Sequence, residues 1–182
     1  MKLISSDNRR IRLASMADID TLTMLARVVA DDLHQHGIDQ WNASYPSQAH
    51  FINDLNRQGL YVAEIDGAIV GSVTIIPEAE PFYHEISWDC QKAYVLHRLM
   101  VHPKWMRQGI GRQLFLIAID VANKANQDSI KVDTHPDNYR MQSLITSLGF
   151  VKRGYIKSMH RIGFELVLNH ESNKGVDLNV HQ

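Results

Sequence analysis

The stretch LMVHPKWMRQGIGR, residues 99–112, decides the fold of this chain because it joins a strand, a turn and a helix in one run. Residues 93–101 predict the strand, and His102-Pro103 ends it. Beyond the turn, residues 109–125 predict a helix with apolar residues on most of its sides. A helix this apolar is covered by protein, so the strand and the helix should both lie at the centre of a domain.

The glycine-rich turn between these two elements suits a phosphate group. Gly109 and Gly111 let the backbone approach a ligand closely, and a helix start offers unpaired N–H groups and a positive dipole end. Arg107 and Arg112 add positive charge. The dinucleotide pattern fails because Leu114 stands in place of its third glycine, and the P-loop pattern lacks its Lys and Ser/Thr. A turn that uses glycine only for packing is the alternative.

The other strand, helix and turn signals predict a single domain with the element order β-α-α-β-β-β-α-β-α-β-β. This order indicates a mixed α/β fold with helices on both faces of a sheet. We expect the domain over residues 1–168 and a polar tail over 169–182. The strands are expected at 9–14, 60–65, 68–76, 93–101, 129–134, 150–157 and 158–168, and the helices at 19–36, around 51–55, at 109–125 and at 138–148.

Charge balance and cysteine content exclude several classes of protein. Lys and Arg number 19 against 20 for Asp and Glu, so the basic excess of a nucleic-acid-binding protein is missing. Cys90 is the only cysteine, which excludes an intramolecular disulfide and the Cys/His zinc spacings, and we expect no metal. No stretch approaches about 18 apolar residues and the N-terminus lacks a signal sequence, so we expect a cytoplasmic protein without a membrane partner.

Residues 94–150 resemble the GNAT superfamily of N-acetyltransferases. In that superfamily the end of the central strand aligns the pantetheine arm of acetyl-CoA, and the glycine turn wraps its pyrophosphate. The resemblance implies acetyl-CoA as co-substrate and a mixed, mostly antiparallel central sheet flanked by helices on both faces. Met106 is a departure, since the superfamily places Arg or Gln there. The residues implied to bind acetyl-CoA are Leu99, Met100, Val101, Arg107, Gln108, Gly109, Ile110, Gly111 and Arg112.

A second resemblance lies in residues 138–150, whose pattern N-x-x-M-x-x-L-I-x-x-x-G-F is similar to the N-x-x-A-x-x-L-Y-x-x-x-G-F element of the superfamily. It implies that Asn138 reaches the pantetheine arm. An asparagine at a helix start is also a common N-cap, and this role is the alternative. Ile145 stands where many relatives carry the Tyr that protonates the departing thiolate, so the group with that role stays open.

Acetylation of an amine needs a base, because an ammonium group must lose a proton before it attacks a thioester. Our first candidate is His97, which strand alternation places on the same face as Leu99. The further candidates are His135, just past the end of a strand, and Glu85, in an acidic loop. A purely structural role is the alternative for a histidine on a strand.

In the superfamily, the loop between the first two helices usually forms one wall of the acceptor site. In this chain that loop carries Trp41 and Tyr45, and the acidic loop at 77–89 carries Tyr83. Aromatic rings beside carboxylates favour a cationic amine, so these three aromatic residues are candidates for substrate binding. The alternative is a solvated acidic loop whose aromatic residues cover the edge of the core.

The function that the resemblance implies is transfer of an acetyl group from acetyl-CoA to the primary amine of a small molecule, by direct attack in a ternary complex. A protein acetyltransferase acting on Lys or an N-terminal amine is one alternative, and it predicts an open groove in place of a lidded pocket. A non-catalytic acyl-CoA-binding module is another alternative, because the usual Tyr is replaced by Ile145. Similar proteins often form dimers, and a homodimer is part of the expectation.

Overall fold

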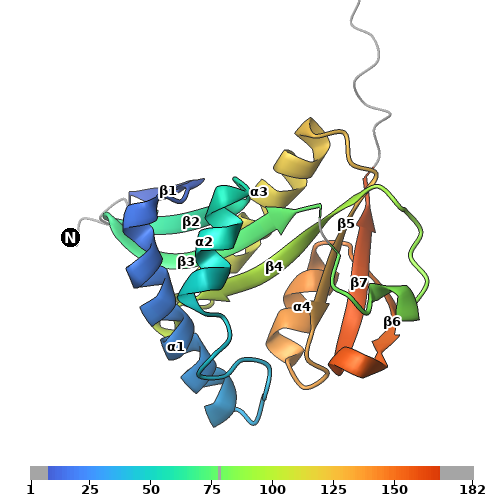
Figure 1. Ribbon diagram of the computed structural model, residues 1–182, viewed down its shortest axis with the longest axis horizontal. Coiled ribbons are helices and arrows are strands. Elements are labelled where there is room, and N and C mark those ends of the chain that lie inside the picture. The colour runs from blue at the N-terminus through green and yellow to red at the C-terminus, as the bar shows by residue number, and fades with distance from the viewer. Residues whose placement is uncertain (1–7, 78, 169–182) are drawn as a thin grey trace, which may run out of the picture.

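The computed structural model describes residues 8–77 and 79–168, which form one seven-stranded sheet with four α-helices (Figure 1). The elements follow the predicted order, so the predicted mixed α/β fold is confirmed. The predicted tail at 169–182 lies outside the described residues. The strands are β1 (Arg9–Leu13), β2 (Leu60–Ile65), β3 (Ala68–Ile76), β4 (Ala93–Val101), β5 (Ser129–Thr134), β6 (Val151–Ile156) and β7 (Arg161–Val167), and the helices are α1 (Ile19–Gln35), α2 (Gln48–Asn56), α3 (Ile110–Lys124) and α4 (Tyr139–Ser147).

The sheet is antiparallel except between its two central strands. Its order is β1-β2-β3-β4-β5-β7-β6, and β4 pairs with β5 in parallel. That pairing joins only residues 93–95 to residues 129–131, after which the two strands diverge (Figure 1). Beyond these residues the facing edges of β4 and β5 form no ladder within the described part of the chain. Their backbone N–H and C=O groups therefore need other partners.

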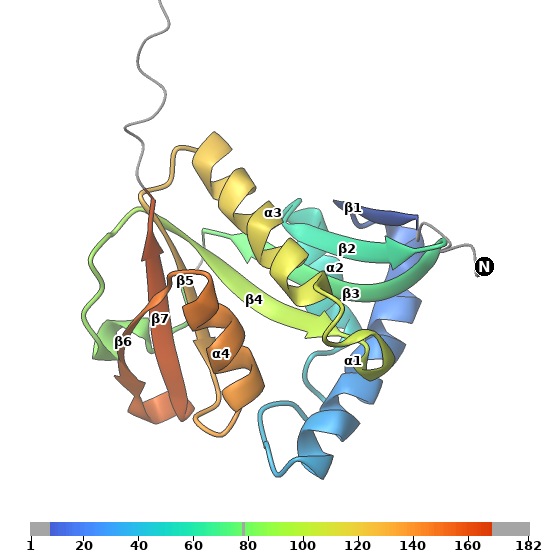
Figure 2. The same ribbon diagram turned by 180° about the vertical axis from the view of Figure 1, so that it is seen from behind.

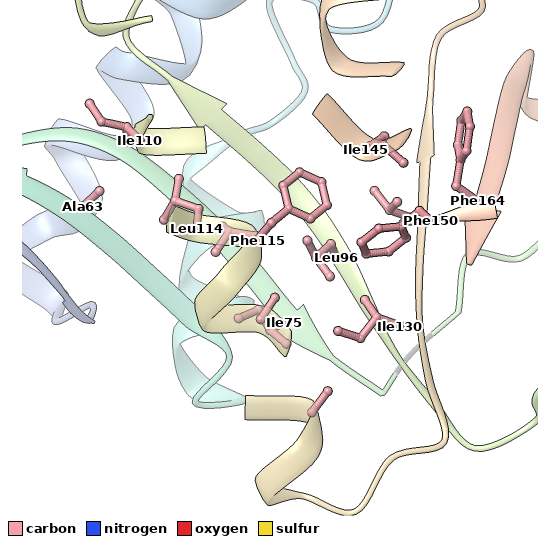
Figure 3. Packing of buried hydrophobic residues seen from close by; sticks show 14 of the residues in the cluster. Ala63, Ile75, Leu96, Ile110, Leu114, Phe115, Ile130, Ile145, Phe150 and Phe164 are labelled. Carbon is pink, nitrogen blue, oxygen red and sulfur yellow. The ribbon is translucent and has the colours of Figure 1, made fainter. Parts of the chain in front are cut away.

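Helices cover both faces of the sheet, as Figures 1 and 2 show from opposite sides. α1 and α2 pack on one face of β2, β3 and β4, with Leu22 and Phe51 among the buried residues of that core. α3 and α4 cover the other face. Phe115 of α3 and Ile145 of α4 belong to one buried cluster with side chains of the strands (Figure 3). Helices therefore cover both faces of the sheet in the region where β4 and β5 diverge.

A loop in place of a helix covers the face of β6 and β7 that lies opposite α4. Gly154 and Gly163 face each other across these two strands. A Cβ at Gly163 would lie 2.6 Å from the Ile86 side chain and 2.8 Å from that of Trp88. The two glycines therefore make room for the loop that precedes β4, and the loop packs directly on the strands.

The last two strands begin and end differently from the prediction, which put the final strand at 158–168. A 3₁₀ turn at Lys157–Met159 and a left-handed residue, His160 with φ of 52°, separate β6 from β7. As a result β7 starts at Arg161, whose neighbour Ile162 pairs with Thr134 at the end of β5. The turn thereby places Arg161 next to the end of β5, one residue before the pairing of β7 with β5 begins.

A β-bulge at Arg98 interrupts β4, and the φ of this residue is 51°. The register between β3 and β4 slips by one residue at this point. His97 is the cross-strand partner of Thr74 and lies on the face of the sheet that α2 covers. Leu99 instead packs into the core on the face that α3 covers. The prediction that His97 and Leu99 share a face is therefore wrong, because side-chain alternation does not continue through a bulge.

A buried ion pair holds the bulge against α2. Nε and Nη2 of Arg98 donate to the two carboxylate oxygens of Asp54 at 2.7 and 2.6 Å, and the Thr74 hydroxyl donates to the same carboxylate at 2.7 Å. The side chain of Asp54 is 0% exposed and that of Arg98 is 9% exposed. Because water solvates neither charge, each group depends on the other for compensation.

Replacing Asp54 with Ala should lower the free energy of unfolding by about 3–5 kcal/mol, because it leaves the Arg98 guanidinium buried without a counter-charge. Asp120→Ala is the matched control, since Asp120 pairs with Lys124 on an exposed helix surface and should contribute less than about 1 kcal/mol. Urea unfolding followed by circular dichroism measures both variants. Equal effects of the two substitutions would contradict a structural role for the buried pair.

Candidate active site

Two adjoining cavities lie where β4 and β5 diverge. We call the larger one, of about 980 Å³, the cleft, and the smaller one, of about 260 Å³, the inner pocket. The cleft is bounded by the end of β4, the C-terminal half of α1, the first turn of α3, and α4. The inner pocket is bounded mainly by β4, β5 and the loop between α1 and α2. The residues that line both cavities are Gln40, Trp41, Leu99 and Met141. Ligands in the two cavities would meet at these residues.

The first turn of α3, which lines the cleft, has the features of an anion site. Gly109 is the N-cap residue, with a φ of 83° that favours glycine, and Arg107 before it has a φ of 61°. The first N–H groups of this 15-residue helix lack intrahelical partners and carry the positive end of its dipole. Arg107 and Arg112 line the same cleft. This combination suits a phosphate or pyrophosphate group.

Most residues predicted to bind the co-substrate line the cleft, and two do not. The side-chain amide of Gln108 donates to the carbonyl of Lys104 at 3.3 Å, and the Ile110 side chain is buried in the core. Met106, the departure from the superfamily pattern, lines the cleft. The predicted residues that line it are Leu99, Met100, Val101, Arg107, Gly109, Gly111, Arg112 and Asn138.

Asn138 is the N-cap of α4, which is the alternative that the sequence left open. Its Oδ1 accepts a hydrogen bond from the N–H of Met141 at 3.1 Å. Its amide nitrogen lies 3.5 Å from Oε1 of Gln40, one of the residues shared by both cavities. Asn138 therefore fixes the start of α4 beside the junction of the cleft and the inner pocket.

The inner pocket is lined by five ionisable side chains: Glu80, His97, Arg98, Asp133 and Arg161, together with Tyr45. Sequence reasoning identified only His97 among the five. Asp133 and Arg161 come together because β5 and β7 pair near this point, which no local pattern reveals. Of the four ionisable residues that were missed, only Glu80 had a sequence signal, as one carboxylate of the acidic loop.

His97 and Glu80 form a hydrogen-bonded pair in the inner pocket. Nδ1 of His97 lies 2.9 Å from Oε1 of Glu80, and the His97 side chain is 6% exposed. The hydrogen bond from His97 lowers the pKa of Glu80, so this carboxylate is ionised at neutral pH. A carboxylate in this position orients the imidazole and stabilises the imidazolium that forms when the ring accepts a proton.

Tyr83 lines neither cavity and instead contacts Asp133, which lines the inner pocket. Its hydroxyl donates to Oδ2 of Asp133 at 2.8 Å, and the Tyr83 side chain is buried. Burial raises the pKa of Tyr83, so the phenol remains a hydrogen-bond donor. Burial raises the pKa of Asp133 above its usual value, and the hydrogen bond from Tyr83 offsets only part of that rise. Of the three predicted aromatic residues, Trp41 and Tyr45 line the inner pocket.

The other two candidate bases lie outside both cavities. Nδ1 of His135 accepts the N–H of Asp137 at 3.1 Å, and burial lowers the pKa of this histidine. The carboxylate of Glu85 accepts the N–H of Ser158 at 3.1 Å, on the outer loop. Ile145, at the position of the superfamily's Tyr, is fully buried in the core. Among the predicted catalytic residues, the fold brings only His97 to the inner pocket.

Within residues 8–77 and 79–168, no helix has the length and apolar character needed to cross a membrane. The same residues contain no group of three or more His, Cys, Asp or Glu side chains that could hold a metal ion. The side chain of Cys90 is partly buried and lies in neither cavity.

Comparison with known proteins identifies the fold and the family. The fold is similar to that of a GNAT-family acetyltransferase from Streptococcus agalactiae, with 22% identity over 88% of this chain and 96% of that chain and a TM-score of 0.76. It is also similar to the PaiA N-acetyltransferase from Thermoplasma acidophilum in complex with coenzyme A (19% identity, 88% and 99% covered, TM-score 0.73) and to YncA from Salmonella typhimurium with its cofactor acetyl-CoA (18% identity, 93% and 99% covered, TM-score 0.67). Residues 26–150 match the acetyltransferase (GNAT) family, and the chain therefore belongs to that family.

Proposed function

We propose that this protein transfers the acetyl group of acetyl-CoA to the primary amine of a small molecule, by direct attack within a complex that holds both substrates. The observation that carries the proposal is the meeting of the cleft and the inner pocket at four shared residues. Family membership supports acetyl transfer, and two proteins of similar fold hold coenzyme A or acetyl-CoA. In this proposal the cleft binds the phosphate-bearing acetyl donor, and the inner pocket binds the small acceptor.

Acetyl-CoA fits the chemistry of the cleft. Its pyrophosphate matches the N–H groups at the start of α3 and the charge of Arg107 and Arg112. Its amide-containing arm matches the edge of β4 beyond residue 95, where the ladder with β5 stops. The thioester then lies beside Leu99 and Met141, at the opening of the inner pocket.

His97 is the base that we assign to the reaction. It removes a proton from the ammonium group of the acceptor, and Glu80 stabilises the imidazolium that results. The neutral amine attacks the thioester carbonyl, the carbon–sulfur bond breaks, and CoA leaves as the thiolate. Ile145 supplies no proton to this thiolate, because the side chain is apolar and buried.

The size of the inner pocket favours a small acceptor over a protein substrate. About 260 Å³ lies below the roughly 300–1,000 Å³ of sites for drug-sized ligands, and Trp41 and Tyr45 form part of its wall. The His97–Glu80 pair favours an enzyme over a non-catalytic acyl-CoA-binding module, because a module that only binds acyl-CoA has no use for a base beside the thioester.

Gly109→Trp should abolish micromolar binding of acetyl-CoA, because the indole would occupy the space in front of the first turn of α3. Gly67→Trp is a matched control: Gly67 has a φ of 82° against 83° for Gly109, and at both positions a Cβ meets no atom within 4 Å. Both variants therefore carry the same backbone strain, of about 1–2 kcal/mol. Calorimetric titration measures the affinities. Retention of binding in Gly109→Trp would place the co-substrate elsewhere.

His97→Ala should lower kcat by about 10²–10⁴-fold, because the ammonium group of the acceptor loses its base. Binding of acetyl-CoA should not change, since His97 does not line the cleft. His34→Ala is the control, because His34 is exposed on α1 and lines neither cavity. Thiol release measures kcat. An unchanged kcat in His97→Ala would remove His97 from the mechanism.

A further inference from the structure

The inner pocket contains both cationic and anionic side chains, and its two arginines are not paired equally closely with carboxylates. Of its two arginines, Arg98 is neutralised by Asp54, with two hydrogen bonds of 2.6 and 2.7 Å. Arg161 has a weaker counter-charge: its Nε lies 3.7 Å from Oδ1 of Asp133, beyond the normal length of a hydrogen bond. Arg161 is therefore the arginine with positive charge to offer a ligand.

Backbone carbonyls hold the Arg161 guanidinium in place. Its Nη1 donates to the carbonyl oxygens of Met159 and His160 at 3.1 and 3.0 Å, and its Nη2 donates to that of Gln40 at 3.2 Å. These bonds fix the position of the group but do not neutralise its charge, because the acceptors are neutral. The side chain is 17% exposed and lines the pocket. Arg161 is thus a pre-positioned cation, the kind of group that binds a carboxylate.

Glu80 supplies the opposite charge. The hydrogen bond from His97 is the main cause of its lowered pKa. Glu80 and Arg161 line the same pocket of about 260 Å³, so both lie within reach of one small ligand. The Glu80 side chain is 27% exposed, so its carboxylate is accessible from the pocket. A ligand with an ammonium group near His97 and Glu80 would have Arg161 close enough to receive an anionic group.

The rest of the pocket wall combines apolar residues with the polar side chains of Gln40, Asn42 and Thr134. Leu96, Val132, Met141 and Met159 line it, and Trp41 adds an aromatic surface. With about 260 Å³ available, these side chains leave room for a small apolar substituent next to the charged groups. Methionine side chains adapt to irregular shapes, so several aliphatic substituents would fit.

We infer that the acceptor is a zwitterionic amino acid with a small aliphatic side chain, whose carboxylate binds Arg161 and whose ammonium group lies at the His97–Glu80 pair. This inference rests on the proposed function. The ammonium group gives one proton to His97, and the neutral amine attacks the thioester. A carbon–nitrogen bond forms, the carbon–sulfur bond breaks, and the second proton of the amine ends on the CoA thiolate. The products are the N-acetyl amino acid and CoA.

The test compares amino acids with the amines that lack their carboxylate: leucine with isopentylamine, and valine with isobutylamine. In the wild-type protein, kcat/KM should be higher for each amino acid than for its matched amine. Arg161→Gln should lower kcat/KM for the amino acids by about 10- to 100-fold, mainly through KM, because a charge-assisted hydrogen bond is lost. The same variant should leave kcat/KM for the amines nearly unchanged. Because the effect of Arg161→Gln is measured on each substrate separately, the different basicities of amines and amino acids cancel in the comparison of variant with wild type.

Two further variants control for structural damage. Arg161→Lys keeps the charge without the fork of donors and should retain part of the preference for amino acids. Arg10→Gln, at an exposed position on the distant strand β1, should retain all of it. Thermal unfolding and acetyl-CoA titration of each variant check folding independently of the acceptor. An equal loss for amino acids and amines in Arg161→Gln would overturn the inference.

The outcomes with the wild-type protein distinguish the inference from the function on which it rests. Acetylation of the amines at least as efficiently as of the amino acids would overturn the inference and leave acetyl transfer to amines in place. Absence of thiol release with every acceptor, in a protein that binds acetyl-CoA, would overturn both. Acetylation of amino acids with an Arg161-dependent preference would support both.

Discussion

The separation of β4 from β5 is the constraint on which the site depends. The two strands pair over residues 93–95 and 129–131 and then diverge, so that unpaired backbone edges line the middle of the sheet. In most sheets such edges are costly, because buried N–H and C=O groups need partners. In this protein the divergence leaves room for the cleft, which α1, α3 and α4 line, and for the inner pocket beside the loop between α1 and α2.

Two buried acidic groups maintain this geometry, one on each side of the divergence. Asp54 on α2 fixes the bulge of β4 through Arg98. Glu165 on β7 is fully buried and accepts the N–H groups of Asp89 and Cys90, which holds the loop before β4 against the second half of the sheet. The same loop also carries Glu80, the carboxylate that lines the inner pocket. A buried charge is costly unless it is paired, and each of these carboxylates has an arginine partner, Arg98 for Asp54 and Arg153 for Glu165.

Much of the fold and of the cleft could be predicted from the sequence, because the relevant signals are local. The element order follows from hydrophobic periodicity and turn residues, and the anion site follows from Gly109 and Gly111 at the start of an apolar helix. The contacts in these features span few residues of the chain. Asn138 was singled out by the pattern of residues 138–150, which left two roles open. The structure shows the N-cap role, through the hydrogen bond from the N–H of Met141.

The inner pocket could be predicted only in small part, because its residues meet through long-range pairing. Arg161 and Asp133 become neighbours by the register of β5 with β7 and by a turn at His160 that no local signal announced. The face of His97 was wrongly predicted because a left-handed φ at Arg98, a residue that rarely adopts it, shifts the register. Glu85 and Glu80 share one acidic loop, and sequence alone does not distinguish the carboxylate that turns inward.

The account depends most on acetyl-CoA lying along the free edge of β4 with its phosphates at the start of α3. Hydrogen–deuterium exchange with and without saturating acetyl-CoA tests this placement directly, because a bound ligand slows exchange of the amides it covers. We predict slower exchange in residues 96–101 and 109–113, and no change in β1. Saturated binding without protection of these two segments would contradict the placement, and with it the meeting of donor and acceptor at the four shared residues.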